Sequence, residues 1–160
     1  MRKWRPHKTR VMTTEQTSNN FILTDDDADD RNFFSEAFSE LDVKGELRTF
    51  SDGKELMDYL NASEITPDVV ILDLNMPRKS GFECITEIRS NARFRSTSIA
   101  VYSTSSSDKD IETTFNSGAN LYIRKPSDYN VLKKIIATVL GTDWSHYALN
   151  TPRDRFLMNF

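Results

Sequence analysis

The segment PDVVILDLNMPRKSGFE, residues 67–83, decides the fold class of this chain. Its uninterrupted apolar run at residues 69–72 is typical of a strand that is covered on both faces. Asp73 follows this run directly, and Ser80 precedes Glu83 by three residues, which is the spacing of a capping box at the start of a helix. The segment therefore predicts a buried strand, a carboxylate at the carboxyl end of that strand, and then a helix.

Short apolar runs and longer amphipathic stretches alternate in the same way from residue 20 to residue 141. This alternation is typical of βαβα units, in which helices cover a parallel sheet. The expected strands occupy residues 21–24, 46–50, 69–72, 99–102 and 121–124, and apolar residues at helical spacing predict a helix after each, the last ending at Gly141. We therefore predict an α/β fold, a doubly wound five-stranded parallel sheet with helices on both faces.

Side chains with reactive groups follow four of the predicted strands. They are Asp25 and Asp26, Asp73, Ser103 and Thr104, and Lys125. Because right-handed crossovers bring the carboxyl ends of parallel strands to one edge of the sheet, we expect these groups to lie together. Clustered carboxylates repel one another unless a cation neutralises them, so a hard divalent ion with oxygen ligands, such as Mg²⁺, suits this site.

Lys125 indicates that the predicted site binds a second anion beside the metal. An ammonium group is redundant for holding a cation, but it suits a phosphoryl group, and the hydroxyl of Ser103 could donate to the same oxygens. Asp73 would then act as a nucleophile and form an aspartyl phosphate.

Four motifs stand in the order that characterises a known family. They are TDDDADD at residues 24–30, the segment at residues 67–83, VYSTSS at residues 101–106 and LYIRKP at residues 121–126. On these residues the chain resembles, from about residue 21 to residue 141, the receiver domain of two-component response regulators, the CheY-like fold. The resemblance implies the flavodoxin-like strand order 2-1-3-4-5. Since no DNA-binding segment follows residue 141, the chain is most similar to a stand-alone receiver.

The resemblance implies a metal and phosphoacceptor site. Asp73 matches the phosphoacceptor, and Asp25 and Asp26 match the acidic pair that holds Mg²⁺. The backbone carbonyl of Asn75 would be a further metal ligand.

The resemblance also implies a switch. Ser103 lies thirty residues after Asp73, where the family has its switch hydroxyl, and Thr104 is the fallback if the loop shifts by one residue. Tyr122 matches the switch aromatic that changes rotamer on activation. Lys125 matches the salt-bridging lysine, and Pro126 after it is expected in a cis bond.

The acidic run is longer than the usual pair, and this raises an alternative. Asp25, Asp27, Asp29 and Glu36 fall at positions one, three, five and twelve of an EF-hand calcium loop. Position six of that loop requires glycine for a sharp turn, and Asp30 stands there. The residues before the run form a short apolar strand pattern, not a helix, so the EF-hand is the weaker interpretation.

The implied function is that of a phosphoacceptor signalling domain. A sensor histidine kinase or phosphorelay protein would supply the phosphoryl group to Asp73, and a downstream protein target would read the result. Such a domain catalyses only its own phosphorylation and dephosphorylation. The alternative is a Mg²⁺-dependent phosphohydrolase that uses the same carboxylates, but the two histidines, His7 and His146, both lie in the tails and offer no general acid.

Composition limits the partners and the compartment. The chain of 160 residues has a formal net charge of −3, but residues 1–20 contain five Lys or Arg and one Glu, which leaves an acidic body. An acidic body is a poor nucleic-acid binder. The longest apolar run is too short to span a membrane, and a single cysteine suits the cytoplasm.

Two terminal segments flank the predicted receiver at residues 20–141. Residues 1–19 form a basic tail that we expect to be disordered. Residues 142–160 contain Trp144, Tyr147, Phe156 and Phe160, which either pack back on the body or contact a partner. Members of the family commonly pair through their last helices, so a homodimer is one of the states that the resemblance allows.

Overall fold

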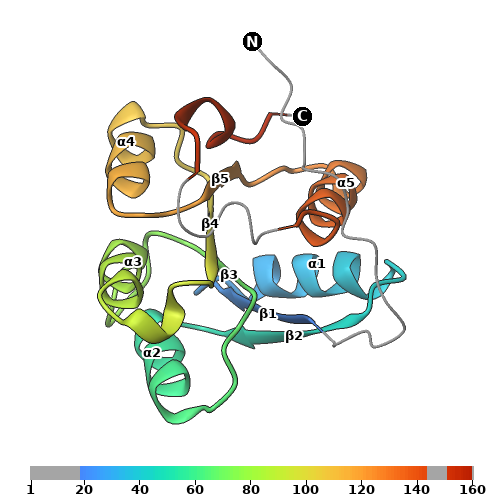
Figure 1. Ribbon diagram of the computed structural model, residues 1–160. Coiled ribbons are helices and arrows are strands. Elements are labelled where there is room, and N and C mark those ends of the chain that lie inside the picture. The colour runs from blue at the N-terminus through green and yellow to red at the C-terminus, as the bar shows by residue number, and fades with distance from the viewer. Residues whose placement is uncertain (1–18, 144–150, 160) are drawn as a thin grey trace.

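Five parallel strands form the centre of the computed structural model, which describes residues 19–143 and 151–159 (Figure 1). The strand order is β2-β1-β3-β4-β5, as the resemblance implies. The strands are β1 (Asn19–Thr24), β2 (Gly45–Phe50), β3 (Val69–Leu72), β4 (Ser98–Ser103) and β5 (Leu121–Arg124). The helices are α1 (Ala28–Ser39), α2 (Gly53–Ala62), α3 (Gly81–Arg89), α4 (Asp108–Asn116) and α5 (Tyr129–Leu140), with short 3₁₀ turns at Ala92–Phe94 and Arg153–Arg155.

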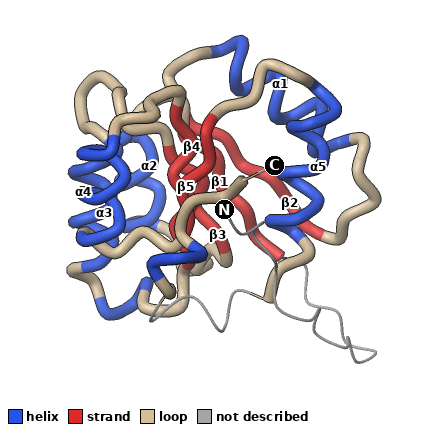
Figure 2. The backbone as a smooth tube through the Cα atoms, turned by 90° about the horizontal axis from the view of Figure 1, so that it is seen from above, coloured by secondary structure: helices blue, strands red, loops and turns tan. Residues whose placement is uncertain are grey.

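Helices cover both faces of the sheet, as predicted. Helices α1 and α5 lie on one face, and α2, α3 and α4 lie on the other (Figure 2). Strand side chains alternate between the two faces: Ile22 packs with the α2–α4 cluster, whereas Phe21 and Leu23 pack with the α1–α5 cluster. The central strand β3 is buried at all four positions, which is why its sequence is a continuous apolar run.

Side-chain caps start the helices close to the sheet edge. The predicted capping box of α3 is present, because Glu83 N donates to Ser80 Oγ and Ser80 N donates to Glu83 Oε2. Only half of the equivalent box forms at α2. Asp52 accepts from Glu55 N at 2.8 Å, but the Glu55 carboxylate accepts from the hydroxyl of Ser51 and does not close the box.

The described part of the C-terminal extension packs back on the sheet. Leu157 forms a parallel bridge with Tyr122 of β5, with Tyr122 N donating to Phe156 O at 2.7 Å and Met158 N donating to Tyr122 O at 3.0 Å. Phe156 is fully buried in the α2–α4 cluster, and Met158 is buried in the α1–α5 cluster. Residues 156–158 therefore lie beside β5 and contribute to both cores.

The other aromatic residues of the extension, Trp144, Tyr147 and Phe160, lie outside the described residues, as does the basic tail up to residue 18. Strand β1 starts at Asn19, within the segment expected to be a tail. None of the helices in residues 19–143 and 151–159 has the length and apolar character needed to cross a bilayer.

Candidate functional site

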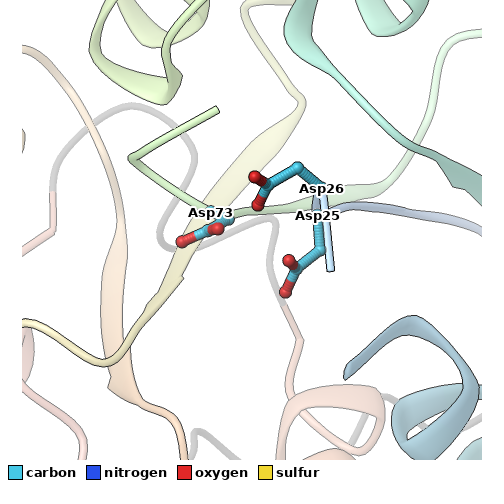
Figure 3. A group of neighbouring side chains, drawn as sticks. All are labelled: Asp25, Asp26 and Asp73. Atoms are coloured by element: carbon cyan, nitrogen blue, oxygen red, sulfur yellow. The ribbon is translucent and has the colours of Figure 1, made fainter. Parts of the chain in front are cut away.

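Three acidic side chains meet at the carboxyl ends of two neighbouring strands. Asp25 and Asp26 follow β1 and Asp73 follows β3, and these strands pair in parallel with Thr24 opposite Leu72. One carboxylate oxygen from each aspartate lies within 4.8 Å of the others. Asp25 and Asp73 are buried, whereas Asp26 is exposed. Figure 3 shows the three carboxylates gathered around a common space.

Backbone amides fix the two buried carboxylates. The sheet ladder continues past the strands, since Asp73 N donates to Thr24 O at 3.0 Å. Asp27 N then donates to Asp25 Oδ1 at 3.0 Å, and Leu74 N donates to Asp73 Oδ1 at 2.9 Å. Each buried carboxylate thus has one oxygen held by the turn that follows its strand.

The loop after Asp73 needs a glycine at its end. A Cβ on Gly81 would lie 2.1 Å from the carbonyl oxygen of Asp73, and Gly81 N donates to Leu74 O at 2.8 Å. Any larger residue would push against the backbone that carries the site. Within the same loop Arg78 has a φ of 67°, and its guanidinium lies 3.2 Å from Asp52 Oδ2.

Burial and the mutual repulsion of the carboxylates disfavour the ionised forms of Asp25 and Asp73. Burial raises the pKa of Asp73 to about 7, the charge of Lys125 opposes this, and the charges of Asp25 and Asp26 reinforce it. Burial also raises the pKa of Asp25, against the hydrogen bond from Lys125. A cation would relieve this repulsion. The donor set of three carboxylates with one exposed member fits a hard divalent ion that keeps several waters.

Lys125 follows β5 and lies on the same rim as the acids. Its Nζ atom is 2.7 Å from Asp25 Oδ2, 2.9 Å from Asp30 Oδ2 and 3.7 Å from Asp73 Oδ2. The side chain is only 10% exposed, and its Nζ lies 5.5 Å from the centre of the Tyr102 ring. Burial alone would lower the pKa of Lys125, but hydrogen bonds to Asp25 and Asp30 raise it above its usual value, so the lysine stays charged.

Sequence reasoning missed the contact between Asp30 and Lys125. From the sequence, Asp30 is one member of the acidic run and position six of the EF-hand pattern, with no partner indicated. Its position could have been found from the helix start, because Asp27 caps α1 and places Asp30 in the first turn, close to the end of β1.

The switch residues predicted from the resemblance lie beside this rim. Ser103 is the last residue of β4 and is buried, with its Oγ accepting from Ser105 N at 3.1 Å, while Thr104 is exposed. Tyr122 is fully buried, and its hydroxyl donates to Ser105 O at 2.9 Å. Asn75 lies two residues after Asp73 and is exposed, and the metal-ligand role of its carbonyl stays a prediction.

One expectation fails: the peptide bond before Pro126 is trans, because the described residues contain no cis peptide bond. The structure also rules out the EF-hand alternative, which the sequence disfavoured: the residues before the acidic run form strand β1, and the side chain of Asp27 caps α1 by accepting from Asp29 N and Asp30 N. The Asp27 carboxylate is therefore the N-cap of α1, and residues 19–39 form a strand, a loop and a helix, not the helix–loop–helix of an EF-hand.

The sheet order and the position of the acids define a class of protein. Ligands of open α/β sheets bind where the strand order reverses, and here that point lies between β1 and β3, where the three carboxylates meet. The family model for the response regulator receiver domain matches residues 21–137. The chain belongs to this family.

Individual relatives agree with the family. Over 122 residues the chain is 31% identical to the chemotaxis protein CheY1 of Helicobacter pylori, covering 76% of this chain and 97% of that protein. Over the same number of residues it is 30% identical to the probable methanogenesis regulatory protein FilR2 of Methanothrix harundinacea, covering 74% and 79%.

Solved structures show the same similarity. The phosphorylated cyanobacterial phytochrome response regulator RcpA is 31% identical, with a TM-score of 0.71 and coverage of 77% of this chain and 91% of that one. The chemotaxis response regulator CheY4 of Vibrio cholerae is 27% identical, with a TM-score of 0.66 and coverage of 78% and 100%. Receiver domains are signalling domains that interact with histidine kinases or phosphorelay proteins and with downstream targets. The comparisons give no support to the phosphohydrolase alternative.

Proposed function

We propose that this receiver accepts a phosphoryl group on Asp73 from a histidine kinase or phosphorelay protein and signals through protein contacts. One observation carries the proposal: at one sheet edge the buried carboxylate of Asp73 lies beside two further acids and close to the largely buried ammonium group of Lys125. This arrangement provides a nucleophile, a cation site and a fixed positive charge for the oxygens of an incoming phosphoryl group. The phosphorylated state of its structural relative RcpA agrees with it.

The metal that this site would hold is Mg²⁺. Asp25, Asp26 and Asp73 would supply side-chain oxygens, and Asn75 its backbone carbonyl. When bound, the ion would neutralise carboxylate and phosphoryl oxygens and so lower the repulsion between them.

The residues of this chain supply the rest of the chemistry. An ionised oxygen of Asp73 forms the new P–O bond while the P–N bond to the donor histidine breaks, and the imidazole leaves with the bonding electron pair. Lys125 binds a phosphoryl oxygen and stabilises the charge in transfer. The amide of Leu74 holds the second oxygen of Asp73, so that the attacking oxygen keeps its direction.

Phosphorylation replaces the single negative charge of the ionised Asp73 carboxylate with a phosphoryl group that carries about 1.5 to 2 negative charges, at the end of β3 and next to β4. We expect the hydroxyl of Ser103 to move toward this charge and the Tyr122 ring to change its packing. Support comes from the bond between the Tyr122 hydroxyl and Ser105 O, which ties β5 to the loop after β4. The altered surface would comprise α4, β5 and α5, and it would contact a cytoplasmic target protein or a second copy of the chain.

Acetyl phosphate labelling tests the function. The wild-type protein should gain one acid-stable, base-labile phosphoryl group in the presence of Mg²⁺, and Asp73→Asn should gain none. Asp58→Asn, which removes an exposed carboxylate on α2, is the matched control and should label normally. Full labelling of Asp73→Asn would refute the assignment. Repeated turnover of simple phosphate esters by the wild type would favour a hydrolase instead.

A further inference from the structure

Among the described residues Lys125 has three carboxylate neighbours, and one of them, Asp30, has no role in the function proposed above. The ammonium lies 2.9 Å from Asp30 Oδ2 but 3.7 Å from Asp73 Oδ2. The shorter distance is that of a charge-assisted hydrogen bond, and the longer one exceeds hydrogen-bond length. In the unphosphorylated protein Lys125 is therefore hydrogen-bonded to Asp30 of α1, and it lies near Asp73 without a hydrogen bond to it.

The position of Asp30 is set by helix α1 independently of Lys125. The Asp27 side chain accepts from the backbone amides of Asp29 and Asp30, at 2.8 and 3.2 Å, and this cap fixes the first turn of the helix. The Asp30 side chain is 36% exposed, whereas that of Asp25 has no exposed surface. Water can replace Lys125 at Asp30 far more easily than at Asp25, so the Asp30 contact is the one that can be given up.

We propose that Asp30 is a positioning residue that retains Lys125 away from Asp73 until a phosphoryl group arrives. The inference rests on the proposed phosphorylation of Asp73. A phosphoryl group on Asp73 carries about 1.5 to 2 negative charges and competes with Asp30 for the same ammonium. Lys125 then exchanges the Asp30 carboxylate for a phosphoryl oxygen. The free energy lost with the Asp30 contact partly offsets the free energy gained from the new contact with the phosphoryl group.

Removal of the Asp30 carboxylate should therefore favour the phosphorylated state. Loss of a partly exposed, charge-assisted ion pair should change the equilibrium constant between the unmodified and phosphorylated states by roughly three- to tenfold. Asp30→Asn should tighten the binding of beryllofluoride, an analogue of the phosphoryl group, to the Mg²⁺-loaded protein by this factor. Asp30→Glu keeps the charge and should bind within about twofold of the wild type.

Asp29→Asn is the matched control. It removes the same charge one residue earlier in the same turn, from an exposed side chain that is not among the three carboxylates contacting Lys125. At physiological ionic strength its general electrostatic effect should stay within about twofold. The effect of Asp30→Asn should also disappear in a Lys125→Met background, because the proposed action passes through the lysine.

Two NMR measurements test the proposal. Fluorine-19 titration with beryllofluoride and Mg²⁺ gives the affinity for each variant, and the carbon-13 resonance of the Lys125 Cε group reports the ammonium contact in the metal-free protein. We expect Asp30→Asn, but not Asp29→Asn, to shift that resonance. Urea unfolding of each variant checks that the fold is retained.

Equal tightening by Asp29→Asn, or tightening that persists in the Lys125→Met background, would overturn the proposal, because either result shows a general charge effect. Failure of the wild type to bind beryllofluoride would instead count against the proposed function. The Cε resonance would still decide the Asp30 contact in that case: a shift specific to Asp30→Asn supports it, and an unchanged resonance overturns it.

Discussion

Replacing Asp73, the proposed phosphoacceptor, should make the metal-free protein more stable. Burial raises the pKa of Asp73 from 3.8 to about 7, so the folded protein disfavours its ionised form. Asp73→Asn removes the charge and keeps nearly the same shape, and the asparagine carbonyl can still accept from Leu74 N, which lies 2.9 Å from Asp73 Oδ1. The variant gives up only the attraction to Lys125 across 3.7 Å.

The size of the gain follows from the shift in pKa. About three pKa units at 1.36 kcal/mol each correspond to about 4 kcal/mol, and the pKa of about 7 already includes the opposing attraction to Lys125, so we expect a gain of up to about 4 kcal/mol at pH 8. Because the folded state holds the proton more tightly, the contribution of Asp73 to stability is complete below pH 3.8 and is lost as the pH rises to about 7. The advantage of the variant should therefore shrink at pH 5.

Urea unfolding in EDTA at pH 8 and at pH 5 measures both effects, with Asp58→Asn as the control for removing an exposed carboxylate. Addition of Mg²⁺ should then stabilise the wild type more than Asp73→Asn. The reasoning is refuted if Asp73→Asn is no more stable than the wild type at pH 8, or if its advantage is the same at both pH values.

Three further changes test other parts of the structure. Mg²⁺ affinity should weaken by up to about tenfold for each pH unit below pH 7, because the Asp73 carboxylate must lose its proton to bind the metal. Calorimetric titrations that give the same affinity at every pH from 5 to 8 would contradict this. Phe156→Ala should lower the free energy of unfolding by about 3 to 4 kcal/mol, because the ring is fully buried. Arg153→Ala, which removes an exposed ion pair, should lower it by about 1 kcal/mol or less. Similar losses for the two variants in urea unfolding would show that the Phe156 ring does not anchor residues 151–159. Gly81→Ala should lower both stability and labelling, because its Cβ would lie 2.1 Å from Asp73 O. Gly141→Ala, whose Cβ would lie 3.1 Å from Ala137 O, should cost less stability and leave labelling unchanged. Normal labelling of Gly81→Ala would show that the loop adapts.

Much of the fold is predictable from local sequence, because buried parallel strands have few alternatives to continuous apolar runs. Residues 69–72 and 121–124 form strands at the predicted positions, and residues 99–102 lie within β4, which is one residue longer at each end. The capping motif at Ser80 likewise marks the start of α3. These signals depend on neighbours within a few residues, which a sequence displays directly.

The remaining features depend on contacts between distant residues. Asp30 and Lys125 are 95 residues apart. The cap at Asp27 places Asp30 in the first turn of α1, but the acidic run does not indicate that Asp30 contacts a lysine from β5. The sequence also left open whether Phe156 packs on the body, because an aromatic side chain has the same pattern in a core and in an interface. Only the pairing of its backbone with Tyr122 decides the matter.

That pairing makes the two edges of the sheet unequal. At the β5 edge the amide and carbonyl of Tyr122 are already bonded to the C-terminal segment, so a foreign strand cannot extend the sheet there without first displacing it. Within the described residues β2 has no neighbour on its outer side, but it carries the exposed charges of Glu46 and Arg48. One edge is thus covered and the other is charged, and both arrangements oppose edge-to-edge pairing of sheets from different molecules into β-rich aggregates.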